Sequence, residues 1–83
     1  MLIKVKCKKY FPSSGLVPKL VECHVNSQRI GFIGELDRDN DDPVEDHPLF
    51  CYVDVDGQAK KILFTGYDEY NNFIGQVMAT CSN

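Results

Sequence analysis

The sequence predicts an α+β fold, in which a mostly antiparallel, five-stranded meander sheet carries one C-terminal helix. Three observations support this class. Residues 2–10 alternate apolar and polar side chains, as a half-buried strand does. Asp56-Gly57 separates two runs rich in β-forming residues. The last segment changes to the period of a helix. With 83 residues, the chain is expected to form a single domain over residues 1–83, because a core of this size does not divide.

The first half of the chain predicts three strands. Residues 2–10 place Ile3 and Val5 on one face and lysines on the other, and residues 19–25 alternate in the same way. After a turn at residues 26–28, residues 29–36 form the third strand. The two glycines within it, Gly31 and Gly34, are typical of a bulge or of close approach by another backbone.

The second half predicts a hairpin followed by the helix. Residues 49–55 and 60–65 are the two strands, and Asp56-Gly57 supplies the positive φ angles of a type I′ turn. Residues 69–81 are expected to be helical, with Asp68 as the N-cap. The apolar residues of this segment fall three or four positions apart, which is one helical stripe: Tyr70, Phe73, Ile74, Val77, Met78 and Cys81.

A sequence echo supports an alternative architecture. Phe32-Ile33-Gly34 recurs as Phe73-Ile74-Gly75, 41 residues later. If this is an internal repeat, the last segment is a strand, and the chain forms an all-β, six-stranded small barrel from two three-stranded halves.

Charge is distributed unevenly along the chain. Nine basic and twelve acidic residues give a net charge of −3, and seven of the acids lie between Glu35 and Asp46. No apolar run approaches the roughly 18 residues of a membrane span, and the alternating N-terminus does not match a secretion signal. The four cysteines lack CxxC spacing and are predicted to be small core residues of a cytoplasmic protein.

The acidic loop, residues 37–48, is the most unusual stretch. Its density of carboxylates predicts that the whole segment lies in water and offers a negative surface to a basic protein partner. Aromatic residues directly after it could anchor such an interface. We therefore expect a small, non-enzymatic protein-binding module, such as an inhibitor or adaptor, with these contact residues: Asp37, Asp39, Asp41, Asp42, Glu45, Asp46, Phe50 and Tyr52.

The sequence is also compatible with two other functions. A small nucleic-acid-binding β domain would use the lysine face of the first strand, namely Lys4, Lys6, Lys8 and Tyr10. A calcium-binding domain would use the DxDxD pattern of the loop, namely Asp37, Asp39 and Asp41. The calcium pattern departs from the EF-hand loop, because Asp42 replaces the glycine of the turn and Pro48 replaces the bidentate glutamate.

No enzyme and no cofactor are expected. The cysteines and the two histidines, His24 and His47, lack the short ligand spacing of a zinc site. No recognisable nucleophile motif accompanies either histidine, and there is no phosphate-binding loop. Charge and aromatic content therefore favour binding over chemistry.

Overall fold

The computed structural model describes residues 1–10, 18–41 and 43–81, with side chains up to residue 79. Its elements in chain order are β1 (Leu2–Tyr10), β2 (Pro18–Asn26), a short 3-10 helix (Ser27–Arg29), β3 (Ile30–Ile33), β4 (Asp37–Arg38), β5 (Leu49–Val55), β6 (Gln58–Phe64) and α1 (Tyr67–Cys81). Two prolines and Gly15 predict a loop at residues 11–18, and all of this segment except Pro18 lies outside the described residues.

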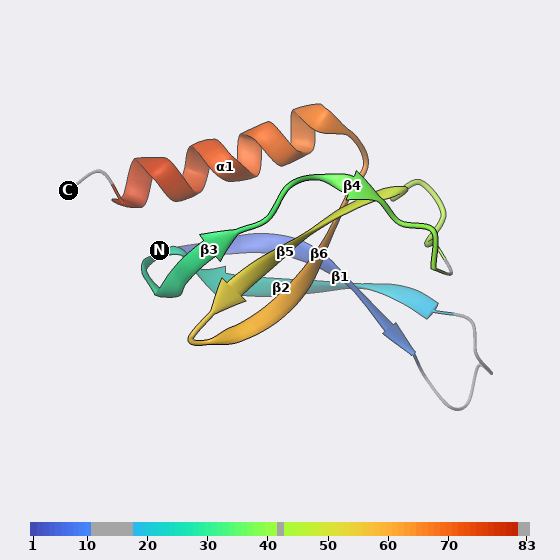
Figure 1. Ribbon diagram of the computed structural model, residues 1–83, viewed down its shortest axis with the longest axis horizontal. Coiled ribbons are helices and arrows are strands. Elements are labelled where there is room, and N and C mark those ends of the chain that lie inside the picture. The colour runs from blue at the N-terminus through green and yellow to red at the C-terminus, as the bar shows by residue number, and fades with distance from the viewer. Residues whose placement is uncertain (11–17, 42, 82–83) are drawn as a thin grey trace.

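All strand pairs are antiparallel, and the order across the sheet is β2-β1-β6-β5-β3, with β4 pairing on β5 (Figure 1). The predicted α+β class, with its five-stranded meander and C-terminal helix, is confirmed. The barrel alternative is wrong, because the sheet is not closed and residues 67–81 are helical. The helical spacing of apolar residues in that segment outweighs its short resemblance to residues 32–34.

The longest pairing joins β1 to β2, from Leu2 opposite Asn26 to Tyr10 opposite Pro18. Paired residues share a face, so the alternation of both strands places their apolar side chains on one side of the sheet. Ile3 and Val5 are 1% and 5% exposed there. The helix packs on the same side through Phe73 and Val77, which are also buried.

The glycines of β3 mark the two features expected of them. The register between β3 and β5 shifts between Ile30 and Phe32, which places an irregularity at Gly31. The N–H of Gly34 donates to the carbonyl of Tyr52 at 2.7 Å, and a Cβ at Gly34 would lie 3.2 Å from that oxygen. A close backbone approach thus holds the chain against β5 beyond the end of β3.

The β5–β6 hairpin turns as predicted. Asp56 and Gly57 have φ angles of 54° and 82°, as a type I′ turn requires. The paired strands then run from Val55 opposite Gln58 to Leu49 opposite Phe64. This hairpin carries the central buried residues of the core, including Cys51, Val53 and Ile62.

The helix begins two residues earlier than expected. It starts at Tyr67, so Asp68 lies within the first turn and its predicted role as N-cap is wrong. The N–H of Tyr70 donates to the carbonyl of Gly66, and the Thr65 hydroxyl donates to Glu69, so the preceding residues join the first turn. Asp68 and Glu69 still complement the positive end of the helix dipole. Within the described residues, no helix has the length and apolar character needed to cross a membrane.

Candidate functional site

The acidic loop is attached to the sheet along part of its length. Asp37 pairs with Phe50 and Arg38 pairs with Leu49, which forms the two-residue strand β4 inside the predicted loop. Immediately after β4, the N–H of Asp39 donates to the carbonyl of Pro48 at 2.8 Å. The loop is therefore an extension of the sheet edge, with its two ends hydrogen-bonded to each other.

Asp39 turns inward from this loop and is 3% exposed. One carboxylate oxygen lies 2.8 Å from Nζ of Lys8 on β1, and the other lies 3.0 Å from Nζ of Lys61 on β6. The Lys8 ammonium also donates to the carbonyl of Asp41. The prediction that the whole loop lies in water is wrong for Asp39, because two lysines and a backbone N–H replace the water it loses. We call Lys8, Asp39 and Lys61 the buried charge cluster.

Opposing effects act on the pKa values of this cluster. Burial would raise the pKa of Asp39, but hydrogen bonds from Lys8, Lys61 and the backbone of Asp41 hold it below its ordinary value. Burial would lower the pKa of Lys8, but its hydrogen bond and charge interaction with Asp39 raise it above its ordinary value. Both groups are therefore charged near neutral pH.

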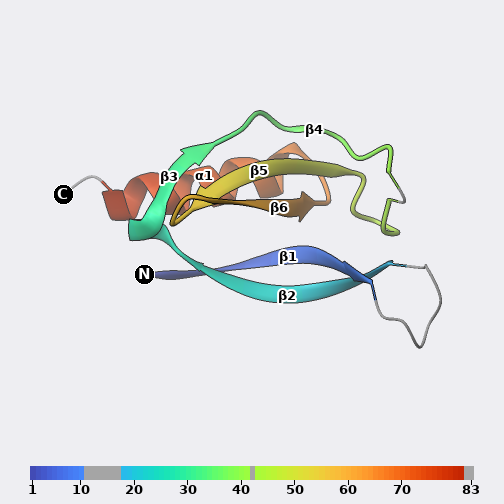
Figure 2. The same cartoon turned by 60° about the horizontal axis from the view of Figure 1, so that its bottom comes forward.

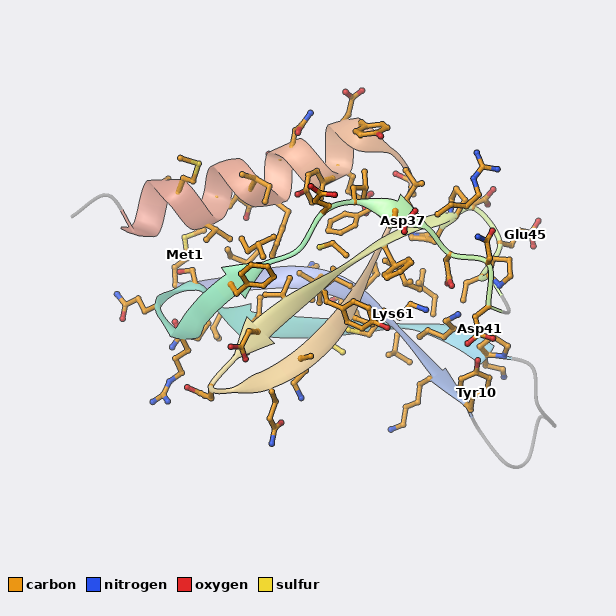
Figure 3. All side chains as sticks on the ribbon, viewed as in Figure 1. Met1, Tyr10, Asp37, Asp41, Glu45 and Lys61 are labelled. Carbon is orange, nitrogen blue, oxygen red and sulfur yellow. The ribbon has the colours of Figure 1, made fainter. Side chains whose placement is uncertain are left out.

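The other described carboxylates of the loop point to solvent. Asp37, Asp41, Glu45 and Asp46 are all exposed. Figure 3 shows Asp41 and Glu45 at the end of the molecule away from Met1, with Lys61 nearer the middle. The predicted contact residue Asp42 lies outside the described residues. The loop thus divides its acids between an internal anchor and an outward-facing group.

An aromatic pair adjoins these acids on β5. The rings of Phe50 and Tyr52 lie edge to face, with centroids 5.3 Å apart, and Tyr52 is 50% exposed. Nζ of Lys61 lies 4.5 Å from the Phe50 ring centroid, so one lysine contacts both the aromatic pair and Asp39. Because Asp37 pairs with Phe50, the acid and the rings share one face of the sheet.

Two further residues lie next to the exposed acids and the aromatic pair, and they were not predicted from the sequence as contact residues. Phe32 is 65% exposed and pairs with Asp54, which lies two residues beyond Tyr52 on the same face. Lys61 connects the loop to the aromatic pair. A signal for Lys61 is present, since the hairpin register places it opposite Tyr52 and directly before the apolar run of residues 62–64. A lysine in that position needs an acidic partner.

The residues of the nucleic-acid alternative are brought together on one face of β1, but their charges are paired. Lys4 and Lys6 lie 3.6 and 3.0 Å from the Glu22 carboxylate, and Lys8 belongs to the buried charge cluster. Hydrogen bonding from Lys6 lowers the pKa of Glu22. Tyr10, at the end of the strand, is 46% exposed. The charges of the lysine face are thus partly compensated by two of the protein's own carboxylates, Glu22 and Asp39.

The described part of the chain does not bring a set of calcium ligands together. Among residues 1–10, 18–41 and 43–81, no three His, Cys, Asp or Glu side chains are grouped in a way that could hold a metal ion. Asp39 faces two ammonium groups, and Asp37 pairs beside Phe50. A cation at Asp39 would have to displace both lysines.

The described cysteines Cys7, Cys23 and Cys51 are free thiols. Burial raises the pKa of Cys51 to about 11. Burial, together with a hydrogen bond to Cys23, raises the pKa of Cys7 to about 12. Both groups are therefore protonated at neutral pH, which makes them poor nucleophiles.

Comparison with protein-family models, with curated proteins and with solved structures finds no match to this chain.

Proposed function

We propose that this protein is a non-enzymatic binding module of the cytoplasm that recognises a basic protein partner, as an inhibitor or adaptor does. The observation that carries the proposal is the pairing of β4 with β5, which places the exposed carboxylate of Asp37 beside Phe50 and Tyr52. Acids and exposed rings on one face are the chemistry that an interface with a basic partner uses.

Arginine is the side chain that this surface suits best. Its guanidinium can stack on an exposed ring while its N–H groups pair with a neighbouring carboxylate. The exposed rings of Phe32 and Tyr52 offer faces for stacking, and Asp37 lies at the end of the same row. A partner with arginines at the spacing of this row would therefore meet both rings and acids.

The anchoring of the loop supports this proposal over a free acidic tail. A loose loop would lose conformational entropy when it binds, and that loss would weaken the complex. Here the buried charge cluster, strand β4 and the bond from Asp39 to Pro48 hold the loop before any partner arrives. The pairing of Lys4, Lys6 and Lys8 with carboxylates makes the nucleic-acid alternative weaker.

The proposal is tested by capturing a partner and then measuring its affinity. The tag belongs on the N-terminus, because Figure 1 places that end of the chain far from the acidic loop. After capture from a lysate of the native cells, the purified partner is titrated against wild type and against Asp37→Asn/Glu45→Gln. We expect this double variant to lose at least about tenfold in affinity, and the wild-type affinity to fall with salt.

Matched variants on the helix provide the control. Asp68→Asn/Glu69→Gln removes the same charge, and Tyr67→Ala removes a tyrosine that is 66% exposed, as the counterpart of Tyr52→Ala. The helix variants should bind within about twofold of wild type, whereas Tyr52→Ala should cost about 1–2 kcal/mol of binding free energy. Equal losses on both surfaces, or unchanged binding of the loop variant, would contradict the proposal.

A further inference from the structure

Strand β2 forms an edge of the sheet. It pairs with β1 along nine residues, and it is the end member of the strand order. Figure 2 shows β2 as the lowest ribbon, with no described element beyond it. A long edge strand of this kind leaves a row of backbone N–H and C=O groups that can pair with another strand. The edge is therefore a ready surface for adding a strand.

The side chains of β2 fit a second copy of β2. When two antiparallel copies of one strand are related by a two-fold axis, the residue numbers of every facing pair add up to the same value. That value is even, because facing residues lie on the same side of the sheet and alternate residues of a strand share a side. With a sum of 46, Glu22 of each copy lies opposite His24 of the other, and Val21 lies opposite Val25. Cys23 then lies opposite itself on the axis. On the inner face the pairs are apolar on both sides, and on the outer face Glu22, which also pairs with Lys4 and Lys6 of its own chain, meets an imidazole that can donate a hydrogen bond to it.

The neighbouring registers are less favourable. A sum of 44 places Glu22 opposite Glu22, and a sum of 48 places His24 opposite His24, so like side chains meet on the axis. Like charges directly opposite each other destabilise a strand pair. Repulsion between the two Glu22 side chains disfavours the sum of 44, and the sum of 48 gives up the pairing of Glu22 with His24, so the register centred on Cys23 is favoured.

The inner face gives a second reason for pairing in this register. Beside β2 lies an open groove of about 420 Å³ that includes Cys7, Val21, Cys23 and Ile62 in its wall. Val21 and Cys23 are only partly buried, and Cys23 packs against the hydrophobic core from its margin. A second β2 strand would place its own Val21, Cys23 and Val25 beside this groove and extend the apolar row across the axis.

We propose that two copies of this chain associate through antiparallel pairing of their β2 strands, with Cys23 on the two-fold axis. The outer edge of β2 is distinct from the acidic loop, which pairs with β5 and reaches across the sheet as far as Lys8 on β1. A dimer built in this way carries two acidic surfaces, and it could therefore bind a multivalent basic partner more tightly than one copy can. The dimer does not depend on the proposed partner, and either can fail alone.

Cross-linking of native cysteines tests the register directly. The probe protein is Cys7→Ala/Cys81→Ala, which keeps Cys23 and the fully buried Cys51. Mild oxidation with copper–phenanthroline, or treatment with a short bis-maleimide, should give a covalent dimer linked at Cys23. The control is Leu20→Cys with Cys7, Cys23 and Cys81 all changed to alanine. In the proposed register, residue 20 lies opposite Asn26, so this control should cross-link at most about a tenth as well.

Substitutions at His24 test the charge pairing by sedimentation equilibrium. His24 is exposed, so replacing it should leave the fold intact. His24→Glu places two glutamates opposite each other twice per dimer, and it should raise the dimer dissociation constant about tenfold. His24→Lys keeps an attractive pair and should bind as tightly as wild type or more tightly. A protein that is monomeric up to about millimolar concentration, or equal cross-linking at residues 20 and 23, would overturn the proposal.

Discussion

Asp39 is the residue on which the arrangement of the acidic loop depends. Its side chain is 1% exposed and forms ion pairs with two lysines that come from different strands. Replacing it with asparagine keeps its shape but leaves the two ammonium groups together without a counter-charge. We expect Asp39→Asn to lower the free energy of unfolding by about 3 kcal/mol, measured by chemical denaturation.

The control for this substitution lies two residues away. Asp41 is exposed, and the loop contact that it makes with Lys8 uses its backbone carbonyl. Asp41→Asn should therefore change the stability by less than about 0.5 kcal/mol. Similar losses in the two variants would show that total loop charge matters and that the buried charge cluster does not.

The same residues give the protein a specific dependence on pH. Because folding lowers the pKa of Asp39, its stabilisation is complete above its ordinary pKa of 3.8 and is lost as the pH falls through the lower folded value. Because folding raises the pKa of Lys8, its contribution is complete below 10.5 and is lost as the pH rises through the higher folded value. The stability difference between wild type and Asp39→Asn should thus be constant from about pH 5 to 9 and shrink in acid, as denaturation at each pH would show. A difference that stays constant down to about pH 2 would contradict this.

The burial of Asp39 could not be predicted from its neighbours in sequence. Within a run of acids, each carboxylate has the same local pattern, and that pattern is typical of a solvated loop. Asp39 differs from the other acids because it contacts two lysines that are distant in the sequence. Lys8 is 31 residues away and Lys61 is 22 residues away. Only the packing of β1 beside β6 brings these lysines together.

At the scale of elements, periodicity predicted the strands and the helix well, because alternating and helical patterns follow directly from which face is buried. The hairpin turn was equally clear, since Asp56-Gly57 has few other uses between two β-rich runs. Strand β4 was missed. Two residues cannot show a period, and Asp37 and Arg38 form a strand only because β5 lies beside them.

Two glycines in different elements should respond to alanine in opposite ways. Gly57 has a φ of 82°, so Gly57→Ala should cost about 1 kcal/mol through backbone strain although the space around it is open. Gly75 is exposed in the helix, and a Cβ there would meet no atom within 4 Å. Gly75→Ala should stabilise the protein by up to about 1 kcal/mol, which is about 4–8 °C in Tm.

Thermal unfolding of both variants checks this pair of predictions. A loss of stability in Gly75→Ala would mean that the exposed helix surface is packed against something in solution. An unchanged Tm in Gly57→Ala would mean that the turn tolerates strain.

On the scale of the whole molecule, the proposed partner-binding surface is separated from the helix-covered core by the sheet itself. The helix covers one face through Phe73 and Val77, whereas Phe32, Phe50, Tyr52 and Asp37 lie on the strands with their side chains on the opposite face. The molecule is elongated, about 45 × 23 × 17 Å, and the acidic loop lies at the end away from the N-terminus (Figure 1). The loop is thus accessible while its anchor, Asp39, stays inside.

Amide hydrogen exchange of the acidic loop, measured by NMR, tests the central claim that the buried charge cluster holds the loop in place for binding. In the wild type, the N–H groups of Asp39 and His47 should be protected, since they donate to the carbonyls of Pro48 and Val44. Asp39→Asn should increase the exchange rates of these two amides. The factor of increase should be at least about ten times the factor for amides of the β5–β6 hairpin. In Asp41→Asn it should not change. Loop amides that exchange freely in the wild type, or protection that survives in Asp39→Asn, would contradict this account.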